Sequence, residues 1–294
     1  MRQFVLPPSW DGGSSLVVSG KEARRLTAVL RLGPGDSFPA LAPDGSGYTC
    51  TVQESGAGRV LLSLVPSSNK SAHPPTYRPD IRAGTSSAHA PHVYTPRTEA
   101  AGTGATIEQD PAVSIPPIFL GVGLLKGSKL DEVVRAATEA GVAALIPLET
   151  DRSMPKGGFS SRLERLRRLS REAIGQSGST IPTRVEQVMP LHRFIEEYNP
   201  AVRSSLGLYF HETPLAESSI HRYCTPRMQA VFACVGPEGG FSGSETTALN
   251  EAGFRPAWLG PAVLRAETAA IFAIASIRII CLERTSWSTS EYRE

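Results

Sequence analysis

Two glycine-containing segments near the carboxyl end of the chain combine residues that could bind a ligand and act on it. The first reads Gly-Pro-Glu-Gly-Gly-Phe-Ser over residues 236–242 and directly follows an apolar run. Gly239 and Gly240 can adopt positive φ and carry no side chain, so a ligand could approach the backbone closely. The Glu238 carboxylate disfavours a pyrophosphate in this loop. A cationic or neutral ligand is therefore expected here.

The elements that must position these loops follow from the apolar pattern. Residues 231–235 form a short continuous apolar run, which is typical of a strand buried in a parallel sheet. Residues 242–245, Ser-Gly-Ser-Glu, predict a capping box and a helix over residues 243–252. A further strand is predicted over residues 254–259, where Pro256 suits its beginning or an edge. The segment thus reads strand, loop, helix, strand, loop, helix.

Together, the two loops resemble the C-terminal signature of the RsmE family. The matching residues are 236–242 and 259–269, the latter reading Leu-Gly-Pro-Ala-Val-Leu-Arg-Ala-Glu-Thr-Ala. Members of this family are SPOUT-class methyltransferases that methylate N3 of one uridine in small-subunit ribosomal RNA with S-adenosylmethionine. Either loop alone could be an ordinary tight turn, whereas the pair is specific.

The resemblance implies an α/β fold with a SPOUT-type trefoil-knotted, mostly parallel sheet and helices on both faces. A small N-terminal PUA-like β-barrel and a homodimer formed through the knot and the final helix are also implied. Loops after three strands would bind S-adenosylmethionine. The cofactor-binding residues carried over are Phe210, His211, Gly236, Glu238, Gly239, Gly240, Leu259, Gly260, Leu264 and Thr268.

The implied reaction assigns roles to two charged residues after the second loop. Methyl transfer from a sulfonium depends on in-line positioning, and the attacking uracil N3 must lose its proton. Arg265 is the candidate for stabilising the developing uracil anion. Glu267 and Glu238 are alternative acid/base or positioning groups, although Glu267 could simply favour a helix N-terminus. The target base must be unpaired or flipped out, because N3 lies on its Watson–Crick edge.

Composition is compatible with an RNA partner. The net charge is only +2, but 25 of the 30 basic residues are arginine. Arginine suits bidentate phosphate contacts and stacking on bases. A genomic bias that replaces lysine by arginine explains the same count equally well, so both readings stay open.

Several basic residues are candidates for RNA contact. A helix over residues 20–32 is predicted with Leu26, Val29 and Leu30 on one face and arginines on the other, which could be a solvated face. Residues 29–36 resemble a stretch of the PUA-like barrel, with two arginines in place of a family histidine just before it. Residues 151–172 hold seven basic and three acidic residues, which favours an RNA-facing stripe. The RNA-binding candidates are Arg24, Arg25, Arg31, Lys126, Arg152, Arg165, Arg168 and Gln176.

Gln176 belongs to a family motif that departs from its usual form in this chain. Gly175 and Ser179 stand where the family has Glu and Arg. If the motif holds the target uridine, this protein would do so with fewer charges.

The chain is divided into three parts by composition. Residues 1–66 hold short β-like runs and one helix, as in a small barrel, and would form the RNA-binding domain. Residues 67–117 are rich in Pro, Ser, Thr and Ala and are predicted to be a flexible insertion or linker. Residues 118–294 would form the methyltransferase domain, beginning with a right-handed βαβ unit.

Further patterns bear on location and cofactors. The four cysteines form no C-x-x-C pair and the six histidines show no metal-ligand spacing, so no metal or disulfide framework is predicted. No signal peptide opens the chain, and residues 266–282 are too charged for a membrane span. A cytoplasmic protein is expected.

Two other functions remain open. A SPOUT methyltransferase that acts on another RNA, such as transfer RNA, would share the same loops. A non-catalytic RNA-binding factor in ribosome assembly could also have kept the fold, although Arg265 and the glycines argue mildly against it.

Overall fold

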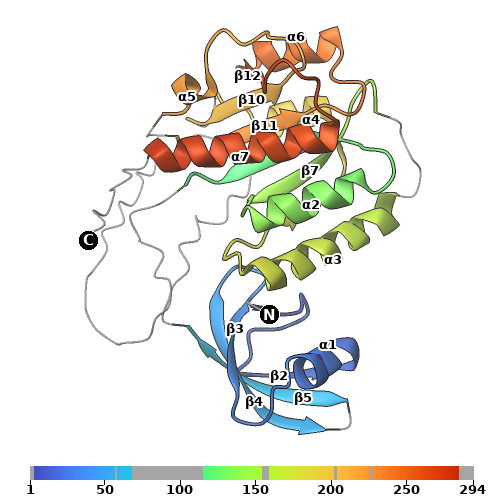
Figure 1. The fold of residues 1–294 in the computed structure, drawn as a ribbon, viewed down its shortest axis with the longest axis vertical. Helices are drawn as coiled ribbons and strands as arrows, with labels where there is room; N and C mark the ends of the chain where they lie inside the picture. The colour runs from blue at the N-terminus through green and yellow to red at the C-terminus, as the bar shows by residue number, and fades with distance from the viewer. Residues whose placement is uncertain are drawn as a thin grey trace, which may run out of the picture.

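The computed structural model describes residues 3–56, 58–67, 115–153, 159–201, 204–225 and 228–284. A smaller unit built on an N-terminal sheet lies below a larger α/β unit in Figure 1. Most of the predicted linker over residues 67–117 lies outside the described residues, as does the tail after residue 284.

The smaller unit is a five-stranded sheet with one helical segment. Strand β1 pairs with β3 in parallel, and the other pairs are antiparallel, in the order β1-β3-β4-β5-β2. Its buried side chains, among them Leu26 and Leu62, form a separate core. Closure of this sheet into a PUA-like barrel stays a prediction. The strands are β1 (Phe4–Val5), β2 (Ser15–Ser19), β3 (Ser37–Leu41), β4 (Gly47–Gly56) and β5 (Arg59–Pro66).

The helix predicted over residues 20–32 is shorter than expected. It consists of α1 (Gly20–Arg24) and the π-helical turn η1 (Arg25–Val29). Arg31 adopts a φ of 56°, and the N–H of Leu32 donates to the Leu26 carbonyl, which ends the helix. A left-handed residue stops a helix because its backbone can no longer continue the hydrogen-bond ladder.

The larger unit is organised around a seven-stranded sheet whose strand pairs are all parallel. The order is β12-β10-β11-β6-β7-β8, and β9 also pairs with β7. The parallel sheet and its βαβ unit are confirmed. The strands are β6 (Ile118–Gly123), β7 (Ala144–Glu149), β8 (Arg184–Val185), β9 (Met189–Pro190), β10 (Leu206–Phe210), β11 (Val231–Val235) and β12 (Arg255–Ala257).

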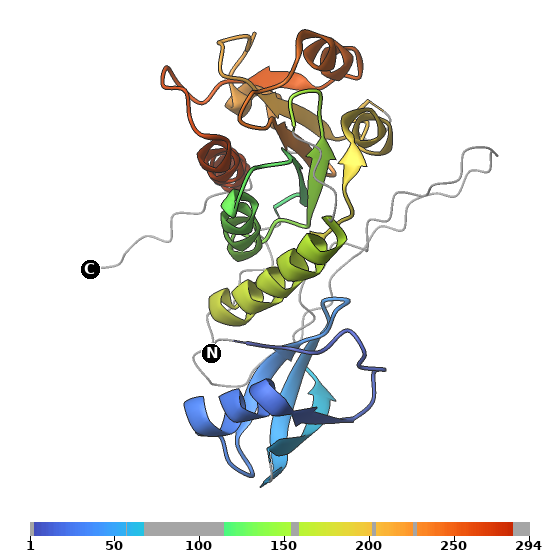
Figure 2. The ribbon, with the colours of Figure 1, turned by 90° about the vertical axis from the view of Figure 1, so that its right-hand side faces the viewer.

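Helices cover both faces of this sheet, as Figure 2 shows. One core contains residues of α2 (Lys129–Glu139), α3 (Phe159–Ser177) and α7 (Ala266–Arg284), with α5 (Ile220–Tyr223) packed against it. The other core contains residues of α4 (Leu191–Glu197) and α6 (Gly243–Glu251). The central strands therefore bury both faces, which explains their continuous apolar runs.

The local signals around the first glycine loop are confirmed. The Ser242 hydroxyl accepts from the Glu245 N–H at 3.2 Å, and the Glu245 carboxylate accepts from the Ser242 N–H at 2.8 Å. This capping box starts α6 as predicted. The strand predicted over residues 254–259 is only β12, and the exposed Trp258 already belongs to the following loop.

Close packing brings the loop after β11 against β6. A Cβ atom on Gly123 would lie 2.4 Å from the Pro237 nitrogen, and one on Gly236 would lie 2.9 Å from the Gly240 carbonyl carbon. Distances this short are incompatible with a side chain at either position. The loops after β6, β10, β11 and β12 consequently meet at one edge of the sheet.

Candidate cofactor site

A cavity of about 310 Å³ lies at this edge, where the carboxyl ends of β10 and β11 meet the start of α7. Its volume falls at the lower end of the range for small-molecule sites, and its position is where parallel α/β sheets bind ligands. The lining residues are Lys129, Phe210, His211, Glu212, Val235, Gly236, Pro237, Glu238, Gly240, Trp258, Leu259, Gly260, Ala262, Val263, Leu264, Arg265, Ala266 and Ala269.

Most of the cofactor-binding residues expected from the sequence line this cavity. Gly239 and Thr268 do not. Gly239 instead faces Arg152, whose Nη1 donates to the Gly239 carbonyl at 2.7 Å. Lys129 and Trp258 also line the cavity but were not predicted. Lys129 follows the RNA-binding candidate Lys126 by three residues, and Trp258 directly precedes the second glycine loop. The expected residues that line the cavity are Phe210, His211, Gly236, Glu238, Gly240, Leu259, Gly260 and Leu264.

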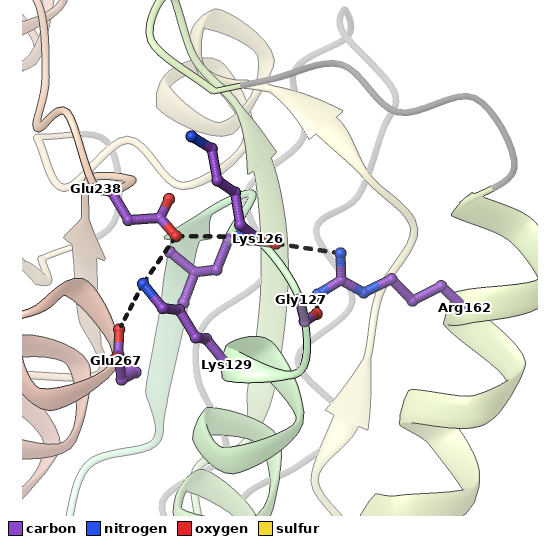
Figure 3. Close-up of polar contacts among 7 residues, drawn as sticks. Lys126, Gly127, Lys129, Arg162, Glu238 and Glu267 are labelled. Atoms are coloured by element: carbon purple, nitrogen blue, oxygen red, sulfur yellow. Dashed lines mark hydrogen bonds and ion pairs between the residues drawn. The ribbon is translucent and has the colours of Figure 1, made fainter.

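Glu238 is the centre of a polar network that joins three elements (Figure 3). Its Oε1 accepts from the Lys126 backbone N–H at 3.1 Å and from Lys129 Nζ, also at 3.1 Å. Burial alone would raise the pKa of Glu238, but hydrogen bonds from its own backbone, Lys126 and Lys129 hold it below its ordinary value. The hydrogen bond to Glu238 raises the pKa of Lys129. The two side chains therefore form an ion pair at neutral pH.

Of the two catalytic candidates, Arg265 and Glu267, only Arg265 lines the cavity. Its side chain is exposed there, at the residue preceding α7. Glu267 is only 8% exposed and lies behind Lys129, with its Oε2 at 3.7 Å from Lys129 Nζ. Oε2 has no hydrogen-bond partner. This placement favours a role in positioning Lys129 over the alternative of direct acid/base chemistry.

The turn that precedes α2 is held from two sides. Arg162 of α3 donates from Nη1 to the Leu125 carbonyl at 3.1 Å and from Nη2 to the Gly127 carbonyl at 2.9 Å. On the other side, the Lys126 N–H donates to Glu238. The exposed Lys126 side chain points away from Lys129 and Glu267 in Figure 3. Arg162 was not among the predicted site residues.

Several basic residues of α3 have partners within the protein. Arg165 pairs with Asp131 of α2, a side chain that is only 4% exposed, and Arg168 lies 3.8 Å from Glu172. The predicted RNA-facing stripe therefore overlaps with contacts that hold α3 to its neighbours. Arg24 and Arg31 are exposed in the smaller unit. RNA contact by any of these residues stays a prediction.

The predicted RNA contacts also include Arg25 and Gln176. Arg25 is half-buried, and Gln176 is exposed near the end of α3. The neighbouring Gly175 is buried, and a Cβ atom there would lie 3.2 Å from the Gln3 carbonyl. The departure from the family motif at residue 175 thus lies where α3 meets the smaller unit.

The described residues contain neither a cluster of metal ligands nor a membrane-spanning helix. Within the described ranges, no three His, Cys, Asp or Glu side chains gather as metal ligands. The helices seen in that same part of the chain are all too short or too polar to cross a bilayer. Cys50, Cys224, Cys234 and Cys281 are buried and form no disulfide.

The chain is similar in sequence to known RNA methyltransferases. Residues 113–278 match the model of the RNA methyltransferase domain. The ribosomal RNA small subunit methyltransferase E of Synechocystis is 33% identical over 165 residues, which are 56% of this chain and 54% of that protein. The Bacillus subtilis protein of the same name is 22% identical over 268 residues, which cover 88% of each chain.

Two solved structures share the fold. The Neisseria gonorrhoeae ribosomal RNA small subunit methyltransferase E, bound to S-adenosyl methionine, has a TM-score of 0.69 at 20% identity over 95% of this chain and 98% of that one. A Legionella pneumophila methyltransferase structure with the cofactor SAM has a TM-score of 0.67 at 22% identity, covering 95% and 97%. With more than half of its length matched by the domain model, this chain belongs to the RNA methyltransferases, within the RsmE family.

Proposed function

We propose that this protein methylates N3 of a specific uridine in small-subunit (16S) ribosomal RNA, with S-adenosylmethionine as the methyl donor. The observation that carries the proposal is the convergence of both glycine loops and the β10 end on one cavity. The relatives named ribosomal RNA small subunit methyltransferase E support the choice of RNA.

The cavity suits this donor chemically. Val235, Leu259 and Leu264 supply apolar surface, and Gly236 and Gly240 leave the backbone accessible. Glu238 supplies a carboxylate that would favour a cationic ligand. When bound there, S-adenosylmethionine supplies the methyl group and a leaving group that takes the electron pair of the broken sulfur–carbon bond.

The chain would contribute positioning and electrostatics. Arg265 lines the cavity from the start of α7, where its backbone carbonyl accepts from the Ala269 N–H at 2.7 Å. A guanidinium there would stabilise the uracil anion that forms as the N3 proton passes to solvent water. The loops around Glu238 would align donor and acceptor, which supplies much of the acceleration.

The topology supports the knotted arrangement expected for the SPOUT class. Strand β10 lies between β11 and β12, so the chain passes beyond β10 after β11 and then returns to α7. Helix α7 packs against α2 and β11 on its return. We propose that this return path threads the loops as a trefoil knot, and that the N-terminal sheet closes as a PUA-like RNA-binding barrel.

A dimer would cover the apolar face that α7 leaves exposed. Ile271, Phe272 and Ile279 are 37%, 50% and 54% exposed and lie on one side of the helix with Ala275. Such a stripe favours a helix-mediated interface with a second copy. Sedimentation should give the mass of a dimer, and Phe272→Glu should shift it toward the monomer. A monomeric wild-type protein would contradict this assignment.

The central experiment maps methylated nucleotides in RNA from cells with and without the protein. Loss of one N3-methyluridine in small-subunit RNA is expected, and addition of the purified protein and donor to RNA or subunits from the deficient cells should restore it. Loss of a methylated nucleotide in transfer RNA would instead favour the hypothesis of a methyltransferase that acts on transfer RNA. Unchanged methylation together with a ribosome assembly defect would favour the non-catalytic factor.

A further inference from the structure

Three charged side chains at the cofactor cavity share a single ion-pair network. Lys129 Nζ lies 3.1 Å from Glu238 Oε1 and 3.7 Å from Glu267 Oε2. The three residues come from α2, the loop after β11 and α7, and Figure 3 shows Lys129 between the two carboxylates. The single ammonium group of Lys129 is thus shared by the carboxylates of Glu238 and Glu267.

The surplus negative charge is not cancelled by the other charged residues of the site. The remaining charged lining residues are Arg265 and Glu212, one of each sign. The formal charges are two positive, on Lys129 and Arg265, and three negative, on Glu212, Glu238 and Glu267, which leaves one negative charge. Among the lining residues and Glu267, negative charge is therefore in surplus by one.

Glu267 contributes to this field without touching the cavity. It does not line the cavity, it is 8% exposed, and its Oε2 has no hydrogen-bond donor. A buried carboxylate interacts more strongly with nearby charges than an exposed one, because water and salt screen it less. Its effect on a ligand in the cavity would consequently be electrostatic rather than steric.

The proposed donor and its product differ in charge at one atom. S-adenosylmethionine carries a sulfonium cation, whereas S-adenosylhomocysteine carries an uncharged thioether and lacks one methyl group. The two molecules are otherwise identical. The ratio of their affinities therefore reports the electrostatic field at the sulfur.

Resting on the proposed function, we propose that the Glu238–Lys129–Glu267 network tunes the site for the charged donor over its uncharged product. Glu267 acts as a specificity-determining residue that lies outside the cavity. After methyl transfer, the network would bind the remaining product less tightly and favour its exchange for fresh donor.

The test measures both dissociation constants by calorimetry on the full chain. The readout is the dissociation constant for S-adenosylhomocysteine divided by that for S-adenosylmethionine. Glu267→Gln should lower this ratio about fivefold, because one unit of negative charge is removed from the network beside the cavity at an intermediate effective dielectric. Added salt should weaken the effect only slightly, since Glu267 is buried.

Two further variants make the test specific. Glu238→Gln should also lower the ratio. If Glu267→Gln does not fold, Glu238→Gln alone tests whether the carboxylates of the network change the ratio. Glu132→Gln is the matched control, because Glu132 is an exposed carboxylate on α2 that does not line the cavity. Its ratio should equal that of the wild type.

The outcomes separate the inference from the function on which it rests. If neither ligand binds the folded wild-type protein, the proposed function fails. If both ligands bind and the carboxylate variants leave the ratio unchanged, the proposed function stands and the electrostatic role of the network is overturned. A ratio that falls equally in Glu132→Gln would also overturn it.

Discussion

The sequence predicted the positions of the residues in the cavity loops better than it predicted the partners of the arginines on helix α3. Both glycine loops fold to the place that their motifs indicated, and most of the expected residues line one cavity. The arginines of α3 were expected to face RNA, yet Arg162 and Arg165 bind a turn and a buried carboxylate within the protein. RNA contact by these arginines stays a prediction, whereas the glycine pattern identified residues that line one cavity.

The difference has a physical origin in the backbone. Gly236 is fixed by close approach, because a Cβ atom would lie 2.9 Å from the Gly240 carbonyl carbon. Such a requirement leaves a mark at one position in the sequence. A long arginine side chain can instead reach solvent, a carboxylate or a carbonyl from the same helix position. Its partner is decided by what else packs nearby.

The largest effect is expected at Arg265, an exposed arginine that lines the cavity. Arg265→Ala should reduce methyl transfer about 100-fold, because an electrostatic stabiliser of the developing anion is lost. Donor affinity should change less than about threefold, since the glycine loops remain. Methyl incorporation and calorimetry measure the two effects. Arg255→Ala, on β12 outside the cavity lining, is the matched control, and full activity in Arg265→Ala would remove its assigned role.

A second prediction tests whether close packing fixes the glycine loop. Gly123→Ala should lower the free energy of unfolding by about 2–3 kcal/mol, because its Cβ would meet the Pro237 nitrogen at 2.4 Å. Gly243→Ala should be neutral or slightly stabilising, since a Cβ there meets nothing within 4 Å at the start of α6. Denaturant unfolding compares them. Equal stability of the two variants would contradict the packing argument.

A third prediction separates structural from exposed arginines on α3. Arg165→Met should lower stability by about 1–3 kcal/mol, because it leaves the buried Asp131 carboxylate without its cation. The Oδ1 of Asp131 already lacks a partner. Arg168→Met should change stability by less than about 0.5 kcal/mol, since both partners of its ion pair are largely exposed. If the two substitutions cost the same, the internal role of Arg165 is wrong.

The smallest effect is expected at Lys126, where backbone and side chain have separate roles. Its N–H holds Glu238, while its exposed side chain is available for a phosphate. Lys126→Ala should therefore keep donor affinity and reduce the slope of RNA affinity against salt by about 0.9 in logarithmic units, the value for one phosphate contact. Filter binding at several salt concentrations measures the slope. An unchanged slope would exclude a phosphate contact at Lys126.

Local sequence signals predicted much of the fold around the site. The capping box at Ser242 and the apolar strand β11 lie where the sequence placed them. The helix at residues 20–32 and the strand at residues 254–259 were drawn too long. Their ends depend on a left-handed residue and on sheet pairing, which short patterns do not specify.

The sequence by itself determined the buried strand β11, the glycine loops and the presence of Glu238 and Arg265 in or beside them, because each depends on neighbours along the chain. Tertiary structure alone decided that Lys129 pairs with Glu238, 109 residues away, and that Glu267 lies behind it rather than in the cavity. These contacts form only when the ends of parallel strands are brought to one edge, and no local periodicity encodes which side chains then meet.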